Sequence, residues 1–459
     1  MKAILALSFF LLSCGSFAAT PPVQSFRALV RVESWTERWP DEAGESQPRD
    51  VKAEVWTDAF QAMLDEQRTL WIPAREQPYY LDAPLVLKSG NSIRAELGAE
   101  IRLKPGVNTC MIRNEHIVGF ADRPVSADSK PDTDLVIEGG IWTTLATGPK
   151  ESNGNDRGWS AKQKPAPGTH GVILLQNVRG VAVRNVTVRQ SMAFAVHLGN
   201  AREFVIDGVT LDRQRRDGVH VNGPSSQGVI RNVQGDSADD MVALNAWEWE
   251  NYAASFGAIH HVVIEHVIGS PAEKHGADAI RLLPGVKRFA DNTTLDCPIH
   301  DIALRDITDI REFKFYDQPN LEHGRDKDFS ITLGKLRDIS LQRLVFTRPG
   351  LIKVAAIVDG LNIDEADLRF APAPDFKLVE IGPMSATYRR GPDPAKWVEI
   401  FSPDIDVTMH RLHLGHITLQ GQPVPDAEAR FVQIKDQQPN PNYPRTTPKG
   451  GAGKARVLP

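Results

Sequence analysis

The sequence predicts an all-β chain wound into a parallel β-solenoid, and three observations support this fold class. The phrase Asp-X-Val-X-X-Asn occurs at 217–222 and again at 240–245, a step of 23 residues. A polar pair followed by an apolar residue recurs at spacings of 23, 24, 34, 40 and 37 residues, starting at Arg184, Asp207, Arg231, Glu265, Arg305 and Gln342. Between Val172 and Leu419 there is almost no helical periodicity, which favours stacked β coils over helical repeats.

The first residues are typical of an export signal. Ile4–Leu12 is apolar but too short to span a bilayer, and Ser16-Phe17-Ala18 supplies the small residues of a cleavage site. We expect residues 1–18 to be a signal peptide and the protein to be periplasmic or secreted. Leu11–Cys14 also resembles a lipobox, so anchoring through a lipid on Cys14 is the alternative. No other segment is long enough to be a transmembrane span.

A short helix is predicted ahead of the coils. From Thr57 to Leu64 the apolar residues Phe60, Met63 and Leu64 recur at helical spacing behind a capping residue. A solenoid needs a cap over its first coil, and this helix is well placed to provide it.

The coils are expected to form one domain over residues 19–435. Spacings of 34 to 40 residues correspond to one coil plus an inserted loop. Residues 436–459 contain Pro439, Pro441, Pro444 and Pro448 and end in a basic, glycine-rich stretch. This composition predicts a disordered tail.

The net charge of the chain bears on the partners to be expected. Of the 459 residues, 53 are basic and 58 acidic, which gives a net charge of −5. Such mild acidity gives no reason to expect nucleic acid or an anionic membrane as a partner. A monomer is expected.

Two cysteines, Cys110 and Cys297, remain after the signal peptide. On the solenoid hypothesis they lie about six coils apart, roughly 25 Å at the strand spacing, which is too far for a disulfide. We predict two buried thiols.

The repeats also place acids and bases in columns. Side chains alternate between the two faces of a strand, so equivalent residues of successive coils stack on one another. The predicted columns are Asp217, Asp240 and Asp278 in one, and His197, His220, Ala243 and Arg281 in the next.

Asp217, Asp239 and Asp240 are the candidate catalytic residues. Glycoside hydrolysis needs one protonated carboxyl group to donate to the leaving oxygen and one carboxylate to activate water or attack. Closely packed carboxylates repel, which raises the pKa of at least one of them.

Asp217-Gly218-Val219 followed by Asp239–Asn245 resembles the signature of glycoside hydrolase family 28, the polygalacturonase type. That family reads Asn-Thr-Asp-Gly and, one coil later, Asp-Asp-Cys-Ile-Ala-Ile, on a right-handed parallel β-helix. Residues 57–104 resemble the first coil of the wider pectate-lyase-like superfamily. The resemblance implies a right-handed helix, an inverting mechanism with Asp239 as general acid, and Asp217 and Asp240 as the residues that activate water.

This chain also departs from the family pattern. Arg215-Arg216 stands where the family has Asn-Thr, and His220 replaces the following Asp. The family's Gly-His-Gly is matched only by His275-Gly276, three residues early. The family's Arg-Ile-Lys appears as Arg281-Leu282-Leu283, so its lysine is missing. These departures leave the sugar that the protein acts on open.

Further residues are candidates for substrate binding. His197, His220 and Arg281 lie in the column beside the acids, Asp278 lies in the acid column, and Lys274 and His275 precede it in the sequence. Trp247 and Trp249 follow the Asp240 strand, where aromatic faces are able to stack on sugar rings. The same histidines and tryptophans equally suit packed structural positions, and Arg281 and Asp278 can simply pair. No spacing typical of a zinc site occurs, and we expect neither a metal nor a cofactor.

We therefore predict an exported glycoside hydrolase that acts on an acidic or galactose-containing polysaccharide or oligosaccharide. Two alternatives stay open at this point. A polysaccharide lyase on the same fold would use Arg281 as base and Asp217, Asp240 and Asp278 as calcium ligands. A carbohydrate-binding β-helix without catalysis would use the acidic column only as part of a binding surface.

Overall fold

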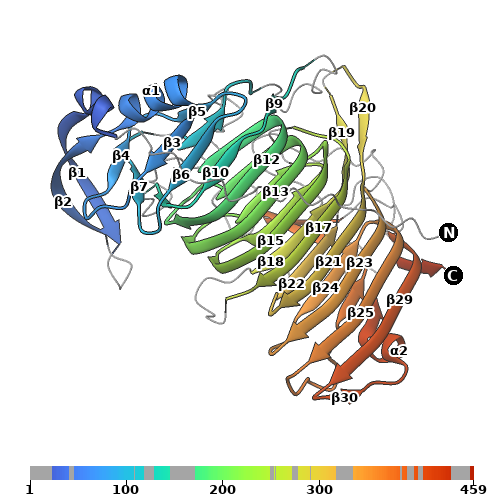
Figure 1. Cartoon of the computed structure of the whole chain (residues 1–459). Helices are drawn as coiled ribbons and strands as arrows, with labels where there is room; N and C mark the ends of the chain where they lie inside the picture. Colours follow the sequence, from blue (N-terminus) through green and yellow to red (C-terminus); the bar gives the residue numbers. More distant parts are fainter. Residues whose placement is uncertain are drawn as a thin grey trace, which may run out of the picture.

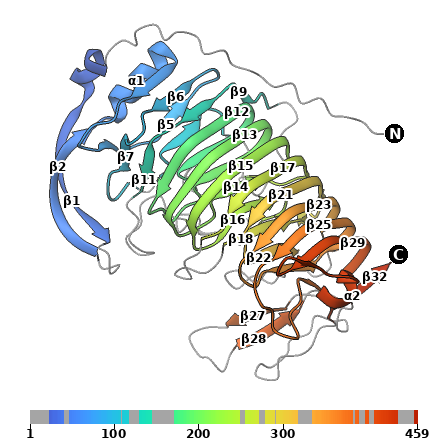
Figure 2. The same cartoon turned by 60° about the horizontal axis from the view of Figure 1, so that its bottom comes forward.

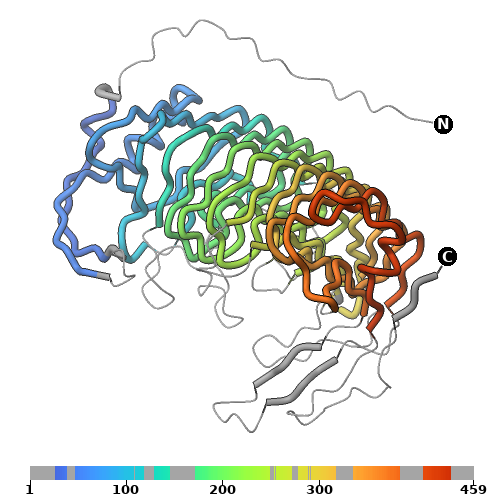
Figure 3. Tube along the Cα trace, turned by 90° about the horizontal axis from the view of Figure 1, so that it is seen from below, coloured from blue at the N-terminus to red at the C-terminus, as the bar shows by residue number. Residues whose placement is uncertain are grey.

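The computed structural model describes residues 23–40, 46–107, 109–117, 129–144, 171–248, 253, 255–270, 278–289, 291–316, 334–382, 385–389, 397–401, 407–435 and 455–458. Within these ranges a sheet of 28 strands winds into a parallel β-helix, which confirms the predicted fold class (Figure 1). The described helices are few and short: η1 (Val23–Leu29), α1 (Thr57–Gln67) and α2 (Ala427–Phe431). Figure 3 follows the coils from the N-terminal end to the C-terminal end.

One face of the β-helix is built from short strands that pair in parallel, coil on coil. In chain order these are β5 (Leu85–Leu87), β8 (Ile112–Asn114), β14 (Val219–Asn222), β16 (Asp240–Asn245), β18 (Ala279–Leu283), β22 (Glu312–Tyr316), β24 (Leu351–Ala355), β26 (Val379–Ile381) and β31 (Val432–Ile434). The first segments of β12 and β13 complete this face between β8 and β14. Figure 2 shows β14, β16, β18 and β22 side by side.

Long strands form the other faces and turn a corner on the way. They are β12 (Ile173–Arg189), β13 (Val196–Gln214), β15 (Ser225–Ser237), β17 (Ile259–Ile268), β21 (Ile299–Thr308), β23 (Lys335–Phe346), β25 (Ile357–Leu368) and β29 (Val407–Leu419). Shorter strands occupy these faces in the first coils, namely β3 (Thr69–Ile72), β4 (Tyr79–Leu81), β6 (Ser92–Ala95), β7 (Glu100–Leu103), β9 (Asp132–Thr133), β10 (Val136–Glu138) and β11 (Ile141–Thr143).

The repeated polar pair marks the corner inside the long strands. Its second residue has left-handed backbone in six successive coils, at Asn185 (φ 53°), Gly208 (78°), Asn232 (57°), His266 (54°), Asp306 (58°) and Arg343 (53°). Glycine and asparagine adopt this conformation at least cost. The repeat found in the sequence is therefore the signature of a turn that bends each strand at the same place.

A continuous apolar core fills the interior from Phe26 to Phe431. At its N-terminal end α1 buries Ala59, Phe60, Met63 and Leu64. The predicted helix is thus confirmed, and it extends three residues beyond Leu64 to Gln67. The predicted capping residue is not, because Trp56 is the N-cap and its side chain makes no capping hydrogen bond. Each coil buries its apolar side chains against its neighbours, which makes the whole stack depend on covered ends.

Antiparallel hairpins are present in addition to the parallel coils. β1 (Arg31–Pro40) pairs with β2 (Ser46–Val55) beside the first coils, an element that the sequence pattern did not predict. Its Glu37 is buried and accepts a hydrogen bond from Tyr80 at 2.9 Å. Two further hairpins join β19 (Gly285–Arg288) to β20 (Thr294–Cys297) and β27 (Ser385–Arg389) to β28 (Trp397–Phe401).

The C-terminal segment differs from the disordered tail expected over residues 436–459. Residues Ala455–Leu458 form strand β32, which pairs in parallel with β29, so this part is ordered by ladder hydrogen bonds. The short strand β30 (Gln422–Pro423) also pairs with β29. Residues 436–454 lie outside the described part of the chain, as does the predicted signal peptide with Cys14.

Both remaining cysteines are buried free thiols, as predicted. Burial raises the pKa of Cys110 and of Cys297 to about 12. Among the described residues, no helix is both long and apolar enough to cross a membrane.

Candidate active site

The site lies on the face of short strands, where the register is parallel from coil to coil. His197 pairs with His220, His220 with Ala243, and Ala243 with Arg281. This confirms the predicted column. The next residue in it is Lys314 on β22, opposite Arg281.

The three candidate acids come together. Oxygen atoms of Asp217, Asp239 and Asp240 all lie within 4.8 Å of one another. The Asp240 amide donates to Asp217 Oδ1 at 3.3 Å, which ties the two coils together at this point. Asp217 and Asp240 are buried, whereas the Asp239 side chain is 28% exposed. Asp239 is therefore the member of the cluster that a bound molecule reaches most easily.

Two cations hold Asp240. Lys314 Nζ donates to Asp240 Oδ1 at 2.7 Å, and Arg281 Nε lies 2.6 Å from Oδ2. Burial by itself would lower the pKa of both bases, but the charge of Asp240 outweighs it and raises both. Tyr316, also buried here, has its pKa raised to about 12, chiefly by burial.

A buried histidine holds Asp217. His220 Nδ1 lies 2.6 Å from Asp217 Oδ2, and His220 Nε2 lies 3.2 Å from Glu248 Oε2. Phe194 stacks flat on the imidazole ring, with centroids 3.9 Å apart and planes at 5°. Glu248 in turn accepts a hydrogen bond from Asn245. An imidazole between two carboxylates carries a proton on each nitrogen, so His220 is an imidazolium that donates in both directions.

The charges around this pair set its protonation. Burial lowers the pKa of His220, yet the hydrogen bonds to Asp217 and Glu248 outweigh it and raise the pKa to about 9. Burial raises the pKa of Asp217, but His220, together with Arg216 and Arg281, brings it down to about 2. Asp217 is consequently ionised over the whole range in which proteins usually work.

Asp239 behaves in the opposite way. Burial and the charges of Asp217 and Asp240 raise its pKa to about 7, against the lowering effect of Arg216 and Arg281. Arg216 Nη1 donates to Asp239 Oδ2 at 3.3 Å. Active sites commonly place a protonated carboxyl group, which acts as the acid, beside an ionised one, which acts as the base. Asp239 and Asp217 form such a pair.

His197 and His220 lie deeper than their expected role in substrate binding requires. Both side chains are buried, and both nitrogens of His220 are engaged by carboxylates. His197 Nε2 lies 2.7 Å from Asn222 Oδ1 and its ring packs edge-on against Phe194. In the structure His220 contacts Asp217 directly, whereas His197 packs edge-on against the His220 ring.

Asp278 does not join the acid column. A β-bulge at Met241 shifts the register, so that Asp240 pairs with Ala279 while Val242 pairs with Ile280. The extra residue displaces Asp278 by one position, and a shift of one residue turns a side chain to the other face. Asp278 instead pairs with Arg348, whose Nη2 lies 3.3 Å away.

The remaining candidates divide into two groups. Trp247 is half-buried and packs against the apolar core next to Gly285, so most of its surface is used in packing. Lys274, His275 and Trp249 lie outside the described residues.

Sequence reasoning did not single out four residues that complete the site: Phe194, Arg216, Glu248 and Lys314. Arg216 was noted only as a departure from the family pattern, and Glu248 lies between the candidate residues Trp247 and Trp249. Lys314 follows Arg281 by 33 residues, beyond the 23-residue step. A count of one coil plus an inserted loop from Arg281 would have located Lys314.

Two groups of described residues have ligand atoms close enough for a metal ion, and each is already paired within the protein. In the first, Asp217, Asp239 and Asp240, the cations His220, Arg281 and Lys314 supply the balancing positive charge. Another cation would be repelled there.

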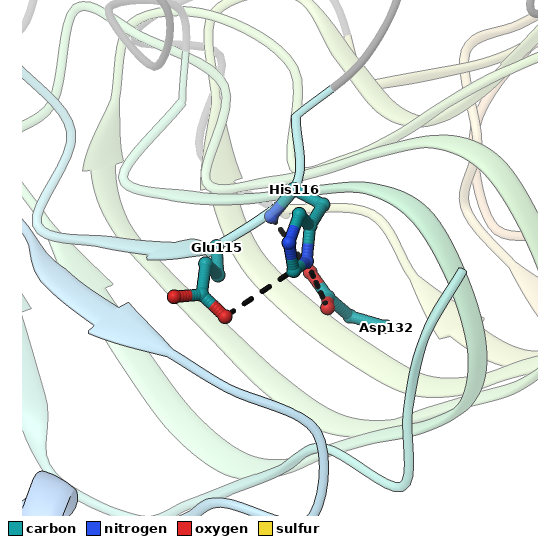
Figure 4. A group of neighbouring side chains, drawn as sticks. All are labelled: Glu115, His116 and Asp132. Carbon is teal, nitrogen blue, oxygen red and sulfur yellow. Dashed lines mark hydrogen bonds and ion pairs between the residues drawn. The ribbon is translucent and has the colours of Figure 1, made fainter. Parts of the chain in front are cut away.

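Glu115, His116 and Asp132 form the second group, beside the end of β8 (Figure 4). Both the amide and Nδ1 of His116 lie 2.8 Å from the Asp132 carboxylate, and Asn114 donates to it at 2.8 Å. These contacts fix the start of the loop after β8, which is a structural role.

Comparisons with known proteins concern the fold. No model of a protein family matches the sequence, and neither does any curated protein. Endo-xylogalacturonan hydrolase from Aspergillus tubingensis is similar in structure, with a TM-score of 0.47 and 10% identity over 86% of this chain and 96% of that one. A family 28 exopolygalacturonase from Yersinia enterocolitica gives 0.38 and 13%, over 86% of this chain and 84% of that one.

The catalytic domain of a GH87 alpha-1,3-glucanase is also similar in structure. It gives a TM-score of 0.43 and 10% identity over 85% of this chain. The match spans 66% of the glucanase chain, slightly less than two thirds of its length.

Proposed function

We propose that the protein is an exported glycoside hydrolase of a polysaccharide or oligosaccharide, with Asp239 as general acid. The single observation that carries the proposal is the contrast between neighbouring carboxyl groups. The pKa of Asp239 is raised to about 7 while that of Asp217 is lowered to about 2, with their oxygen atoms within 4.8 Å. Cleavage of a glycosidic bond needs this combination of a proton donor and an ionised carboxylate.

In the proposed reaction Asp239 gives its proton to the glycosidic oxygen as the bond to the sugar breaks. Asp217 and Asp240 hold a water molecule and orient it towards the anomeric carbon. Asp217 takes a proton from that water, and the imidazolium of His220 stabilises the carboxylate in position. Activity then requires protonated Asp239 and ionised Asp217, which sets a pH window between about 2 and 7.

We propose inversion of configuration, as the resemblance to family 28 implies. The acids are nevertheless closer than the roughly 6.5–9.5 Å that usually separates the carboxyl groups of inverting enzymes. Proton NMR of the first product formed decides this point, because the newly released anomer has inverted or retained configuration before it equilibrates.

An acidic substrate is favoured by the cations beside the acids. Arg281, Lys314 and Lys353 occupy successive positions of one column on β18, β22 and β24. Lys314 supplies positive charge next to Arg281 although Arg281-Leu282-Leu283 lacks a lysine. A row of cations on neighbouring coils suits a glycan that carries carboxylate or sulfate groups.

The lyase alternative fits the geometry less well. Its base would be Arg281, but the pKa of that guanidinium is raised by Asp240 even against burial, so it does not give up its proton. Its calcium ligands would include Asp278, which pairs with Arg348 instead of joining Asp217 and Asp240.

The proposal is tested by product analysis on pectic and algal polysaccharides with the wild type, Asp239→Asn and Asp240→Asn. We expect new reducing ends from the wild type and none from either folded variant. Unsaturated products absorbing in the near ultraviolet would support a lyase instead. Equal activity of the variants and the wild type would remove the assignment. Export, proposed from the apolar segment 4–12, is tested by locating the full-length chain after cell fractionation.

A further inference from the structure

Besides the imidazolium of His220, three cations contact or face the acid cluster, and two of them are bound to Asp240. Arg281 and Lys314 both hold Asp240, at 2.6 and 2.7 Å, and their side chains are almost buried. The Lys314 contact is a charge-assisted hydrogen bond, and the Arg281 contact is a close ion pair. Loss of either cation would leave the buried Asp240 carboxylate with one balancing charge in place of two.

Arg216 is held differently. Its Nη1 lies 3.3 Å from Asp239 Oδ2, a long contact for an ion pair, and the two side chains are 25% and 28% exposed. Its guanidinium also lies over the face of Phe194, with Cζ 5.8 Å from the ring centroid. Of the cluster's ion pairs in the described part of the chain, Arg216–Asp239 has the longest contact and the most exposed side chains.

This pair contains a chemical conflict. A general acid needs its proton, but a neighbouring guanidinium stabilises the carboxylate and favours its loss. Arg216 therefore opposes the role of Asp239 for as long as the two stay together. The conflict ends if another anion attracts Arg216 when substrate binds.

We propose that Arg216 is a substrate-binding residue that takes an anionic group of the sugar next to the cleaved bond and leaves Asp239 as it does so. The ligand class is a glycan with a carboxylate or a sulfate ester, either of which a guanidinium binds through two parallel hydrogen bonds. This inference rests on the proposed function, since it assigns Asp239 the role of acid. It adds a reason for Arg216 to stand directly before Asp217.

Transfer of Arg216 changes the electrostatics of Asp239 in a definite direction. In the free protein Asp239 faces Arg216 and Arg281 as cations and Asp217 and Asp240 as anions, with Lys314 and the imidazolium of His220 paired behind. Removing Arg216 leaves both anions and takes away one cation. The pKa of Asp239 then rises further, so binding of an anionic substrate itself increases the protonated fraction of the general acid.

The test compares the wild type, Arg216→Gln and Arg216→Lys, with Arg231→Gln as matched control. Arg231 pairs with Asp207 on the neighbouring coil at 2.7 Å and lies at the strand corner. The first readout is carboxyl-carbon NMR titration of Asp239, assigned by its loss in Asp239→Asn. It is recorded without ligand, with oligogalacturonate, with a sulfated galactan oligosaccharide and with a neutral galactan oligosaccharide.

We expect Arg216→Gln to raise the pKa of Asp239 by about one unit without any ligand. In the wild type we expect the same rise on adding one of the two anionic oligosaccharides, and the one that acts identifies carboxylate or sulfate as the group recognised. Arg216→Gln should show no further rise, Arg216→Lys an intermediate one, and Arg231→Gln should behave as the wild type. An Asp239 pKa that is unchanged by Arg216→Gln, or by both anionic ligands in the wild type, would overturn the proposal.

The second readout is kcat/KM across pH on the same oligosaccharides. We expect the wild type to prefer the anionic substrate over the neutral one by about tenfold or more, and Arg216→Gln to lose this preference while its alkaline limb moves to higher pH. If the wild type binds an anionic oligosaccharide with a rise in the pKa of Asp239 but cleaves none, the hydrolase assignment is wrong and the Arg216 binding site is supported. Cleavage with equal selectivity in Arg216→Gln removes the Arg216 site and leaves the hydrolase.

Discussion

Two aspartate–histidine pairs in this molecule have nearly the same local geometry and different surroundings. Asp217 and His220 Nδ1 are 2.6 Å apart, and Asp132 and His116 Nδ1 are 2.8 Å apart. Both carboxyl groups are buried, yet the His220 side chain is 1% exposed and that of His116 is 60% exposed.

The surroundings decide what each pair does. The hydrogen bond to Asp132 raises the pKa of His116, and His116 and Asn114 lower that of Asp132 against its burial. These are the same directions as in the Asp217 pair. Only Asp217 has two more carboxyl groups within 4.8 Å, one of which keeps its proton. The Asp217–His220 pair therefore belongs to a reactive site because of the carboxyl groups around it. Its own geometry does not set it apart, since the Asp132–His116 pair in a loop has nearly the same one.

The largest expected effect is a difference in kcat between a substitution beside the Asp217–His220 pair and one in the Asp132–His116 pair. Asp239→Asn removes the proton donor beside Asp217, and we expect kcat to fall by about a thousandfold. Asp132→Asn changes the other pair and should leave kcat within a factor of two or so of the wild type. Initial rates at pH 5 on the preferred polysaccharide measure both. Similar losses in the two variants would show that folding, and not chemistry, is responsible.

The next effect concerns the histidines. His220→Gln leaves Asp217 buried without its cation, so we expect unfolding free energy to drop by about 3 kcal/mol. His116→Gln changes an exposed side chain, where solvent screens the pair, and should cost less than about 1 kcal/mol. Urea unfolding at pH 6 followed by circular dichroism gives both values.

The same substitution should move the acidic limb of activity. Without His220, burial dominates and the pKa of Asp217 rises from about 2, so the acidic limb of kcat/KM moves up by about two pH units. His116→Gln should leave the limb in place. An unmoved limb in a folded His220→Gln protein would contradict the role assigned to Asp217.

A smaller effect is expected from Glu248→Gln, through the pH dependence of stability. The pKa of His220 is raised from 6.5 to about 9, so its contribution is fully present below pH 6.5 and is lost as pH rises through 9. Replacing Glu248 lowers this pKa and reduces the contribution by about 1.5 kcal/mol below pH 6.5. Unfolding free energies at pH 6, 7, 8 and 9 should therefore fall less steeply in the variant. Parallel curves would show that Glu248 does not stabilise the imidazolium.

The smallest expected effect is that of a chelator. The cations around Asp217 and Asp240 are side chains, so incubation with EDTA should leave the rate unchanged. The loop group at Asp132 should also keep its stability, since His116 and Asn114 supply its contacts. Loss of activity that added calcium restores would instead favour the lyase mechanism.

Much of this arrangement could be predicted from the sequence because a parallel coil converts spacing into position. The step of 23 residues placed Asp217 beside Asp240, and alternation placed His220 in the column that leads to Arg281. The same reasoning failed at Asp278, where a single bulged residue at Met241 altered the register. Periodicity carries no information about such an insertion, since the bulge depends on how two strands fit.

The sequence by itself determined the solenoid, its N-terminal helix, the two buried thiols and the meeting of three carboxyl groups, because each follows from a repeat length or an apolar pattern. Only the tertiary structure decided the charges around those groups. Glu248 reaches His220 by folding back after β16, and Lys314 reaches Asp240 across an insertion of irregular length. Protonation depends on distances of a few ångströms between side chains, and the order of residues along a chain does not specify such distances.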